Sequence, residues 1–166
     1  LFSGTVEDNV FFGQSAAEKT DASLQAALSL SQAAEFVDKY PEKAAHPIAQ
    51  LGRNVSGGQK QRLSIARALA RTPEILIFDD SFSALDYKTD ATLREGLAKE
   101  LPDTTKIIVA QRISTIRNAD QILVLDRGEI AGLGTHDALM ASCTVYREIA
   151  MSQLSEEELK KGGASK

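Results

Sequence analysis

The stretch from Asn54 to Asp86 constrains the fold of this 166-residue chain more than any other part of it. It starts with Ser56, Gly57 and Gly58, which precede small and apolar residues at helical spacing up to Pro73. The first N–H groups of a glycine-rich helix have no backbone partner and the helix dipole is positive there, so a phosphate can approach closely. The three residues alone are also compatible with an ordinary turn. The pattern predicts a helix whose start is suited to an anion.

A short apolar run follows this helix and stops at two carboxylates. Residues 75–78, Ile-Leu-Ile-Phe, come directly before Asp79 and Asp80. A central parallel strand is buried on both faces, and ligands bind at the carboxyl ends of such strands. A strand that runs into a solvated acidic turn is the alternative interpretation. We expect a buried strand that places Asp79 and Asp80 at the edge of a sheet.

The remaining segments alternate between helix and strand patterns. Apolar side chains recur at helical spacing in residues 20–40 and 88–100, whereas residues 105–110 and 121–125 are short apolar strands. Strands that alternate with helices favour an α/β fold with a parallel sheet. The turn at 126–128 is expected to join the last strand to residues 129–133 as a hairpin.

One further helix is expected near the C-terminus. Thr135 is a suitable N-cap for a helix that begins at His136. The apolar side of this helix is expected to consist of Leu139, Tyr146, Ile149 and Met151.

The composition excludes several classes of protein. The net charge is −4, so the chain lacks the basic surface of a nucleic-acid-binding protein, and we expect no nucleic-acid partner. Cys143 is the single cysteine, which excludes an internal disulfide. No apolar run approaches the roughly 20 residues that a transmembrane helix needs. We expect the polypeptide to be soluble and any attachment to a membrane to come from elsewhere.

The order and spacing of residues 54–86 resemble the signature motif, the Walker B motif and the D-loop of ATP-binding cassette (ABC) ATPases. The resemblance is specific, because three motifs with separate chemical functions coincide. It covers nearly all of residues 1–152 and is to the second half of an exporter nucleotide-binding domain. It implies an α/β fold in which part of a P-loop NTPase (RecA-like) parallel sheet core joins an α-helical ABC subdomain. The implied parts are the helical subdomain at 1–70, the later half of the core at 71–152 and a flexible tail at 153–166.

The resemblance also assigns residues to two ATP sites. In the family, two nucleotide-binding domains face each other head to tail, and the signature of one subunit covers the ATP that the other holds. The signature residues, which would bind the partner's nucleotide, are Ser56, Gly57, Gly58 and Gln59. The D-loop, which communicates between the two sites, ends at Asp86, a further candidate for cofactor binding.

The chain's own site departs from the family pattern at two positions. Asp79 has the position that holds Mg²⁺, usually through water because this ion dehydrates reluctantly. Asp80 stands where the family has the glutamate that polarises the attacking water, and it is shorter by one methylene. Gln111, within TKIIVAQRISTI, replaces the switch histidine, and glutamine cannot take up a proton. Two altered catalytic positions in one site resemble the degenerate subunit of a heterodimeric exporter.

One component of an ATP site is missing from the sequence. No GxxxxGK[ST] motif, the loop that grips the phosphates, occurs in the 166 residues. The opening LFSGTVEDNVFFG resembles the segment after the Q-loop of exporters and has no initiating Met, so we expect a piece of a longer protein. As it stands, the chain is predicted to bind ATP poorly and to hydrolyse it negligibly. The uncovered edges of a partial sheet also favour self-association.

These expectations combine into one function and two alternatives. The chain is expected to be part of the ATP-hydrolysing domain of an ABC exporter at the cytoplasmic face of the cell membrane, with ATP and Mg²⁺ as cofactors. Its partners would be a second ABC nucleotide-binding domain, in a heterodimer, and a membrane-spanning domain on the same full-length chain. A non-catalytic regulatory or dimerisation domain is one alternative. The other is a soluble ABC ATPase that acts on nucleic acid or the ribosome, and the exporter-like opening and acidic balance weigh against it.

Overall fold

The structure is a computed structural model that describes residues 1–153. By its internal contacts the chain divides into two compact units, residues 1–107 and 108–166, and each is described by itself. The expected boundary at residue 70 remains a prediction. The expected tail at 153–166 lies, except for its first residue, outside the described residues. Within residues 1–153, no helix combines the length and the apolar character that crossing a bilayer requires.

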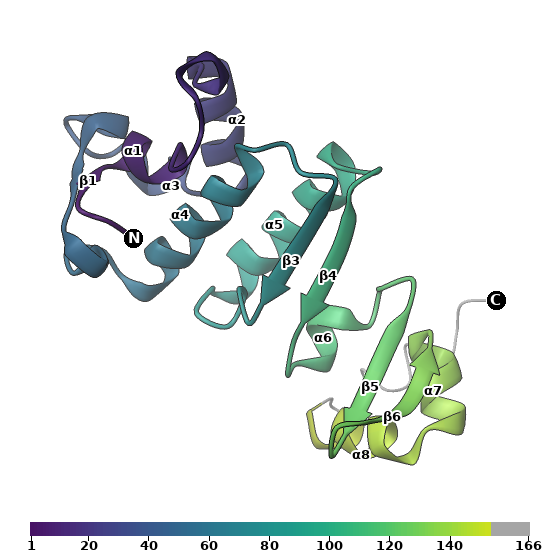
Figure 1. Ribbon diagram of the computed structural model, residues 1–166. Coiled ribbons are helices and arrows are strands. Elements are labelled where there is room, and N and C mark those ends of the chain that lie inside the picture. Colours follow the sequence, from purple (N-terminus) through teal and green to yellow (C-terminus); the bar gives the residue numbers. More distant parts are fainter. Residues whose placement is uncertain (154–166) are drawn as a thin grey trace. The chain divides into compact units, whose positions relative to one another are not determined.

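The longest elements of the first unit are helices (Figure 1). They are α1 (Val6–Val10), α2 (Asp21–Leu30), α3 (Ala34–Val37), α4 (Gly57–Leu69) and α5 (Tyr87–Glu100), with 3₁₀ turns at Ala16–Glu18, Lys43–Ala45 and Gln50–Gly52. Thr5, Thr20 and Ser56 each form a capping box at the start of α1, α2 and α4. The helices expected in 20–40, after Gly57 and in 88–100 are confirmed.

α4 is the helix against which α1 and α2 pack in this unit. Its Leu63 and Ala66 side chains are fully buried. Farther along, Arg67 donates hydrogen bonds to the backbone and side-chain oxygens of Asn9 in α1, at 2.6 and 3.0 Å. Apolar packing and charge-assisted hydrogen bonds therefore hold α4 at several points along its length.

The first unit also contains short strands. β1 (Gly4–Thr5) pairs with β2 (Pro47–Ile48) in the antiparallel sense. β3 (Ile75–Asp79) pairs with β4 (Thr105–Val109), and α5 connects the two. The arrows of β3 and β4 point the same way in Figure 1, as the expected parallel arrangement requires.

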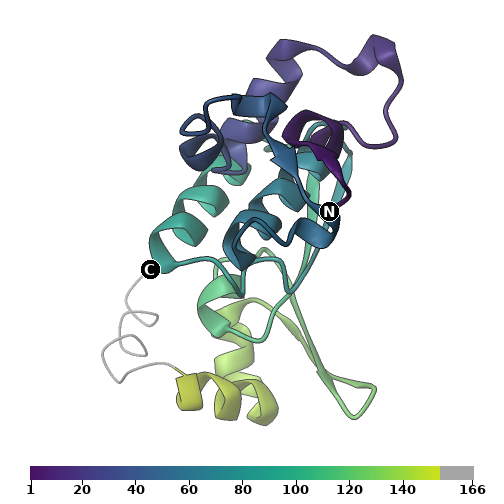
Figure 2. The same ribbon diagram turned by 90° about the vertical axis from the view of Figure 1, so that its left-hand side faces the viewer.

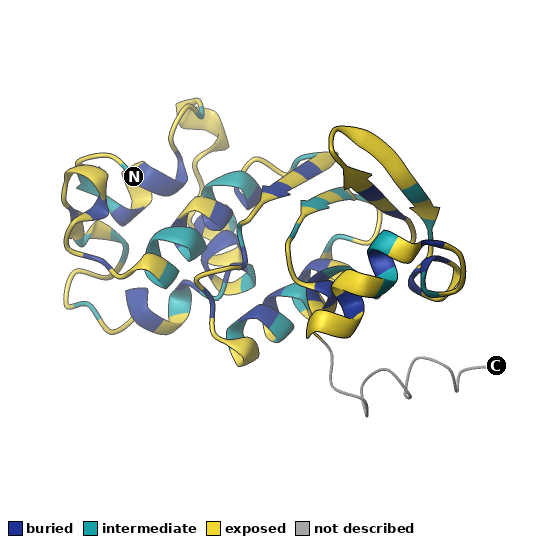
Figure 3. Cartoon of the chain, turned by 90° about the horizontal axis from the view of Figure 1, so that it is seen from below, coloured by how far each residue is buried: buried dark blue, intermediate teal, exposed yellow. Residues whose placement is uncertain are grey.

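The expectation that β3 is buried on both faces is wrong. Leu76 and Phe78 are each 3% exposed, but Ile75 and Ile77 are 56% and 68% exposed. Successive side chains of a strand point to opposite faces, and among the described residues only one face of β3 is covered. The same alternation of buried and exposed positions is visible along strand arrows in Figure 3.

The second unit is built on a hairpin of β5 (Ile122–Asp126) and β6 (Glu129–Gly134), which lie side by side in Figure 1 and Figure 2. The strands are antiparallel, and Asp126 is opposite Glu129. Arg127 and Gly128 have positive φ angles of 50° and 84°, as both central residues of a tight primed turn require. The expected hairpin is confirmed.

Short helices cover this hairpin. They are α6 (Ile113–Ile116), α7 (His136–Ser142) and α8 (Thr144–Gln153). The Thr135 hydroxyl oxygen accepts a hydrogen bond from the Ala138 N–H, so the expected cap is confirmed. The buried core of the unit consists of Ile113, Ile122, Val124, Leu139, Cys143, Tyr146 and Ala150.

The expectation of one continuous C-terminal helix is wrong. Cys143 has an extended backbone, with φ −108° and ψ 108°, and ends α7. Because α8 then starts anew, its buried residues are Tyr146 and Ala150, and Ile149 and Met151 lie at the surface. Of the four side chains expected on the apolar face, Leu139 and Tyr146 are buried.

Candidate functional site

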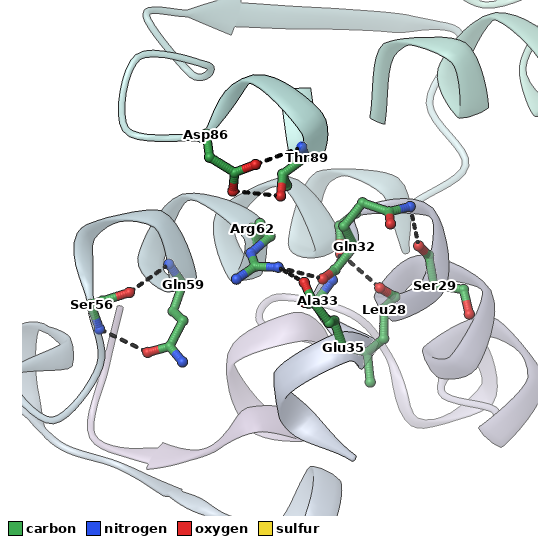
Figure 4. A network of polar contacts seen from close by, with 11 residues as sticks. Leu28, Ser29, Gln32, Ala33, Glu35, Ser56, Gln59, Arg62, Asp86 and Thr89 are labelled. Carbon is green, nitrogen blue, oxygen red and sulfur yellow. Dashed lines mark hydrogen bonds and ion pairs between the residues drawn. The ribbon is translucent and has the colours of Figure 1, made fainter. Parts of the chain in front are cut away.

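The start of α4 presents the residues that the sequence assigns to the partner's nucleotide. Ser56 Oγ accepts a hydrogen bond from the Gln59 N–H at 3.3 Å, and Gln59 Oε1 accepts one from the Ser56 N–H at 2.8 Å (Figure 4). The N–H groups of Gly57 and Gly58 have no intrahelical partner. The Ser56 hydroxyl also keeps its own hydrogen to donate. An anion before α4 would meet these donors and the positive end of the helix dipole.

The two glycines of the signature differ in their surroundings. A Cβ atom at Gly58 would lie 3.0 Å from the backbone oxygen of Ala84, closer than nine in ten real contacts of this kind. At Gly57 the nearest atom to an added Cβ would be the Ala84 Cβ, at an ordinary 3.8 Å. Glycine at position 58 therefore permits a close approach between α4 and the segment after β3.

That segment, residues 80–84, is called the Asp80 turn below. Asp79 ends β3, Asp80 follows it, and both are exposed, as the sequence predicted for a strand end. Asp80 has a φ of 48°, an uncommon conformation that Asp tolerates better than most residues. The Asp80 carbonyl oxygen accepts hydrogen bonds from the Ser83 N–H and hydroxyl, at 3.3 and 3.0 Å. The turn thus has a defined backbone path.

Gln61 is a residue that sequence reasoning missed. Its side-chain oxygen accepts a hydrogen bond from the Ala84 N–H at 3.1 Å. Its amide nitrogen lies 3.4 Å from both the Asp80 carbonyl oxygen and Ser83 Oγ. Helical spacing was the available signal, because Gln61 is one turn beyond Gly57 and so shares its face.

Arg62, next to Gln61, fixes α4 to the turn after α2 and to α3. Its Nη1 donates to the Gln32 carbonyl oxygen at 2.9 Å and to Glu35 Oε2 at 2.8 Å (Figure 4). Its guanidinium also lies 4.9 Å from the centre of the Phe36 ring, a cation–π distance. Consecutive residues of α4 therefore contact different neighbouring segments.

Asp86 is engaged within its own helix. Its Oδ1 accepts from the Thr89 N–H at 3.0 Å and its Oδ2 from the Thr89 hydroxyl at 2.7 Å, so that it caps α5 (Figure 4). These two hydrogen bonds, the backbone one first, lower the pKa of the Asp86 carboxyl below its ordinary value. Cofactor binding by Asp86 remains a prediction, and helix capping is the role visible here.

Gln111 belongs to the second unit and is exposed. Its carbonyl oxygen accepts a hydrogen bond from Gln153 Nε2 at 2.8 Å. Gln153 Oε1 in turn accepts from the Ile113 N–H at 2.9 Å, which connects the end of α8 to the start of α6. The expected meeting of Gln111 with Asp79 and Asp80 remains a prediction.

Asp79 could contribute one oxygen to a metal site. In residues 1–153, no three His, Cys, Asp or Glu side chains lie together as a ready-made metal site. Mg²⁺ typically takes one or two carboxylates and completes its shell with water and phosphate oxygens, so an exposed Asp79 fits that use.

Known proteins are similar in sequence to this chain. The family model described as ABC transporter matches residues 2–83, which include α4, β3 and most of the Asp80 turn. An uncharacterized ABC transporter ATP-binding protein of Mycobacterium tuberculosis is 47% identical over 154 residues, covering 92% of this chain and 26% of the relative. The chain belongs to the ABC transporter family. This confirms the resemblance to ABC ATPases that the motifs indicated.

Two further ABC proteins are similar along nearly the whole chain. An ATP-dependent lipid A-core flippase of Xanthomonas oryzae is 40% identical over 159 residues, covering 95% of this chain and 27% of the flippase. The solved structure of a bacterial Atm1-family ABC exporter with ATP bound has a TM-score of 0.88 and 35% identity, covering 94% of this chain and 27% of that one. The fold is that of an ABC exporter nucleotide-binding domain, and the chain spans about a quarter of the length of these relatives.

Proposed function

We propose that this chain is part of the ATP-binding and ATP-hydrolysing domain of an ABC-type membrane exporter. The observation that carries the proposal is that the capped start of α4 lies against the Asp80 turn within one compact unit. Residues assigned to both ATP sites are therefore neighbours. The flippase and the Atm1-family exporter among the similar proteins support an exporter.

The signature residues would complete the ATP site of a partner subunit. The Gly57 and Gly58 N–H groups and the Ser56 hydroxyl would donate hydrogen bonds to the terminal phosphate of that nucleotide. Gln59 would keep Ser56 oriented, because the two side chains cap each other's backbone. The donors need little rearrangement, since the capping box already fixes them.

The chain's own site would mainly hold nucleotide. Asp79 would bind Mg²⁺, which neutralises charge on the phosphates when it is present. Asp80 would orient water from a position one methylene short, and a misplacement of about 1 Å costs roughly a hundredfold in rate. Gln111 would donate a hydrogen bond to the terminal phosphate but could neither accept a proton nor carry charge.

The arrangement implies a specific set of partners. A second ABC nucleotide-binding domain would supply a site that this chain's signature completes, in an asymmetric heterodimer. A membrane-spanning domain on the same full-length chain would bring the pair to the cytoplasmic face of the cell membrane. The chain alone would lack turnover, because the loop that grips the phosphates is absent from its sequence.

A non-catalytic regulatory or dimerisation domain is the second candidate function. Asp80 and Gln111 favour it, because both stand at positions where the family has its catalytic glutamate and histidine. The two candidates differ in whether the signature of this chain supports hydrolysis in the partner's site.

Site-specific variants of the assembled full-length pair test this difference. Ser56→Ala removes a donor aimed at the partner's nucleotide, and we expect ATP turnover to fall by about a hundredfold. Asp80→Asn alters the chain's own site, and we expect turnover to change less than twofold. The reverse pattern would contradict the proposed asymmetry, and equally small effects of both variants would favour the regulatory candidate.

Thr20→Ala is the matched control for Ser56→Ala. Thr20 forms the same capping box with Ser23 at the start of α2. Removing either cap should lower stability by about 1 kcal/mol. Turnover should be normal in Thr20→Ala, so that loss of a cap is separated from loss of a phosphate donor.

A further inference from the structure

Gln61 connects the signature helix to the turn that carries Asp80, and we infer that it is a positioning residue that couples the partner's ATP site to this chain's own. The inference rests on the proposed function, because two sites exist only if Ser56–Gln59 and Asp80 act on nucleotides. Gln61 itself would touch neither nucleotide. It acts through the backbone of the Asp80 turn.

The contacts of Gln61 are concentrated on that turn. Its side-chain oxygen accepts from the Ala84 N–H at 3.1 Å, the shortest of the three contacts. Its amide nitrogen reaches the Asp80 carbonyl oxygen and Ser83 Oγ at 3.4 Å each. One side chain of α4 therefore holds the first and the last residue of the Asp80 turn.

Steric contact supports the same connection. Gly58 and Gln61 lie one helical turn apart on α4 and both meet Ala84, one at its carbonyl oxygen and the other at its N–H. The hydrogen bond of Gln61 and the close packing of Gly58 thus bring α4 against both peptide groups of Ala84. A displacement of the start of α4 would strain the hydrogen bond between Gln61 and the Ala84 N–H.

Arg62 gives the helix a second anchor in another direction. Its hydrogen bonds to Gln32 and Glu35 hold α4 to the turn after α2 and to α3. The first two turns of α4, the α2–α3 turn and the Asp80 turn are therefore joined through two consecutive residues. Closure of Ser56–Gln59 on the partner's nucleotide would move α4 and, through Gln61, reposition Asp80.

A double-mutant cycle on amide exchange tests this coupling. Exchange of the Ala84 N–H is measured by NMR in the chain, in Gln61→Ala, in Ser56→Ala and in the double variant. Loss of the hydrogen bond in Gln61→Ala should speed exchange about fivefold. Ser56→Ala frays the start of α4 and should also speed it, but only while Gln61 transmits the change. In the double variant we expect no increase beyond Gln61→Ala.

Two further variants separate positioning from general destabilisation. Gln61→Glu keeps a side-chain oxygen for the Ala84 N–H and should restore slow exchange. Gln25→Ala changes an exposed glutamine of α2 and should leave Ala84 unaffected. Additive effects of Ser56→Ala and Gln61→Ala, or unchanged exchange in Gln61→Ala, would overturn the inference.

Turnover of the assembled full-length pair supplies the functional readout. Gln61→Ala should lower kcat and leave the KM for ATP nearly unchanged, because loss of the contact with the Asp80 turn leaves the start of α4, and with it the phosphate donors of the partner's site, less precisely positioned without removing a binding contact. Normal kcat in Gln61→Ala would overturn the inference alone, since the wild-type pair still turns over. A wild-type pair that neither binds nor hydrolyses ATP would instead overturn the proposed function and, with it, the coupling of two sites.

Discussion

Gly58 lies so close to Ala84 that an added methyl group would sit 3.0 Å from the Ala84 carbonyl oxygen. Gly57, one residue earlier, has room for a methyl group at 3.8 Å from its nearest neighbour. The pair of glycines therefore has one member that packing requires and one that packing does not.

Gly58→Ala is predicted to destabilise the chain, whereas Gly57→Ala is not. The crowded oxygen belongs to a backbone segment that Gln61 also holds, so relief of the clash requires a shift of the Asp80 turn. Overpacking of this kind typically costs about 1–3 kcal/mol. Urea unfolding of both variants measures the difference, and equal stabilities of the two variants would be the contrary result.

The Asp86 carboxyl is expected to cause part of the acid sensitivity of the first unit. Hydrogen bonds from Thr89 lower the pKa of its carboxyl in the folded state, so the unfolded state binds the proton more readily. Its contribution to stability is present above the unfolded pKa of about 3.9 and is lost as the pH falls through the folded pKa. Asp86→Asn keeps a capping oxygen and should lose less stability than the wild type between pH 5 and pH 3, in urea titrations at each pH. Parallel losses in both proteins would count against this account.

The His136 imidazole is expected to make the stability of the second unit depend on pH. It is buried with its Nδ1 2.8 Å from the Tyr146 hydroxyl, and burial, then the charge of Arg117, lowers the pKa of the imidazole. The unfolded state therefore binds more protons, and stability falls as the pH drops below the unfolded pKa of about 6.5 toward the folded one. His136→Gln removes the titration and keeps a polar partner for Tyr146. Thermal unfolding at pH 7.5 and pH 5.5 should show a smaller change in Tm for the variant than for the wild type.

The exposed Ile77 side chain is expected to promote self-association of the chain. It is 68% exposed on the uncovered face of β3, and exposed apolar strands favour association between molecules. Ile77→Thr retains a β-branched side chain and should reduce the apparent mass in light scattering at high concentration, with little loss of stability. Leu76→Thr, on the buried face, should instead destabilise the fold. A wild-type chain that stays monomeric at high concentration would rule out this association.

Local chemistry made much of the fold predictable from the sequence. The helix start at Ser56–Gly58, the turn at Arg127–Gly128 and the Thr135 cap depend on neighbouring residues, and the structure has each of them. Features that depend on distant packing were missed. One face of β3 is exposed because no other described segment covers it, which the sequence of the strand itself does not indicate. The break between α7 and α8 comes from the extended backbone of Cys143, and no local sequence signal marks it.

In the candidate site, too, local features could be predicted and distant contacts could not. Asp79 and Asp80 could be placed at a strand end from the apolar run before them, and the structure has them there. Gln61 was not recognised, because its importance comes from contacts with a turn about twenty residues away. The capping role of Asp86 was also missed, although Asp three residues before Thr89 is a typical start of a helix.

The central claim is that this chain holds one part of a composite ATP site and needs a phosphate-gripping loop to bind nucleotide. Calorimetric titration of ATP with Mg²⁺ into this chain, beside a version extended at its N-terminus to include such a loop, tests it most directly. We predict that only the extended protein binds ATP. In the extended protein with Asp79→Ala, Mg²⁺ should no longer change the affinity for ATP. Equal binding by the 166-residue chain would place the phosphate site elsewhere and contradict the assignment.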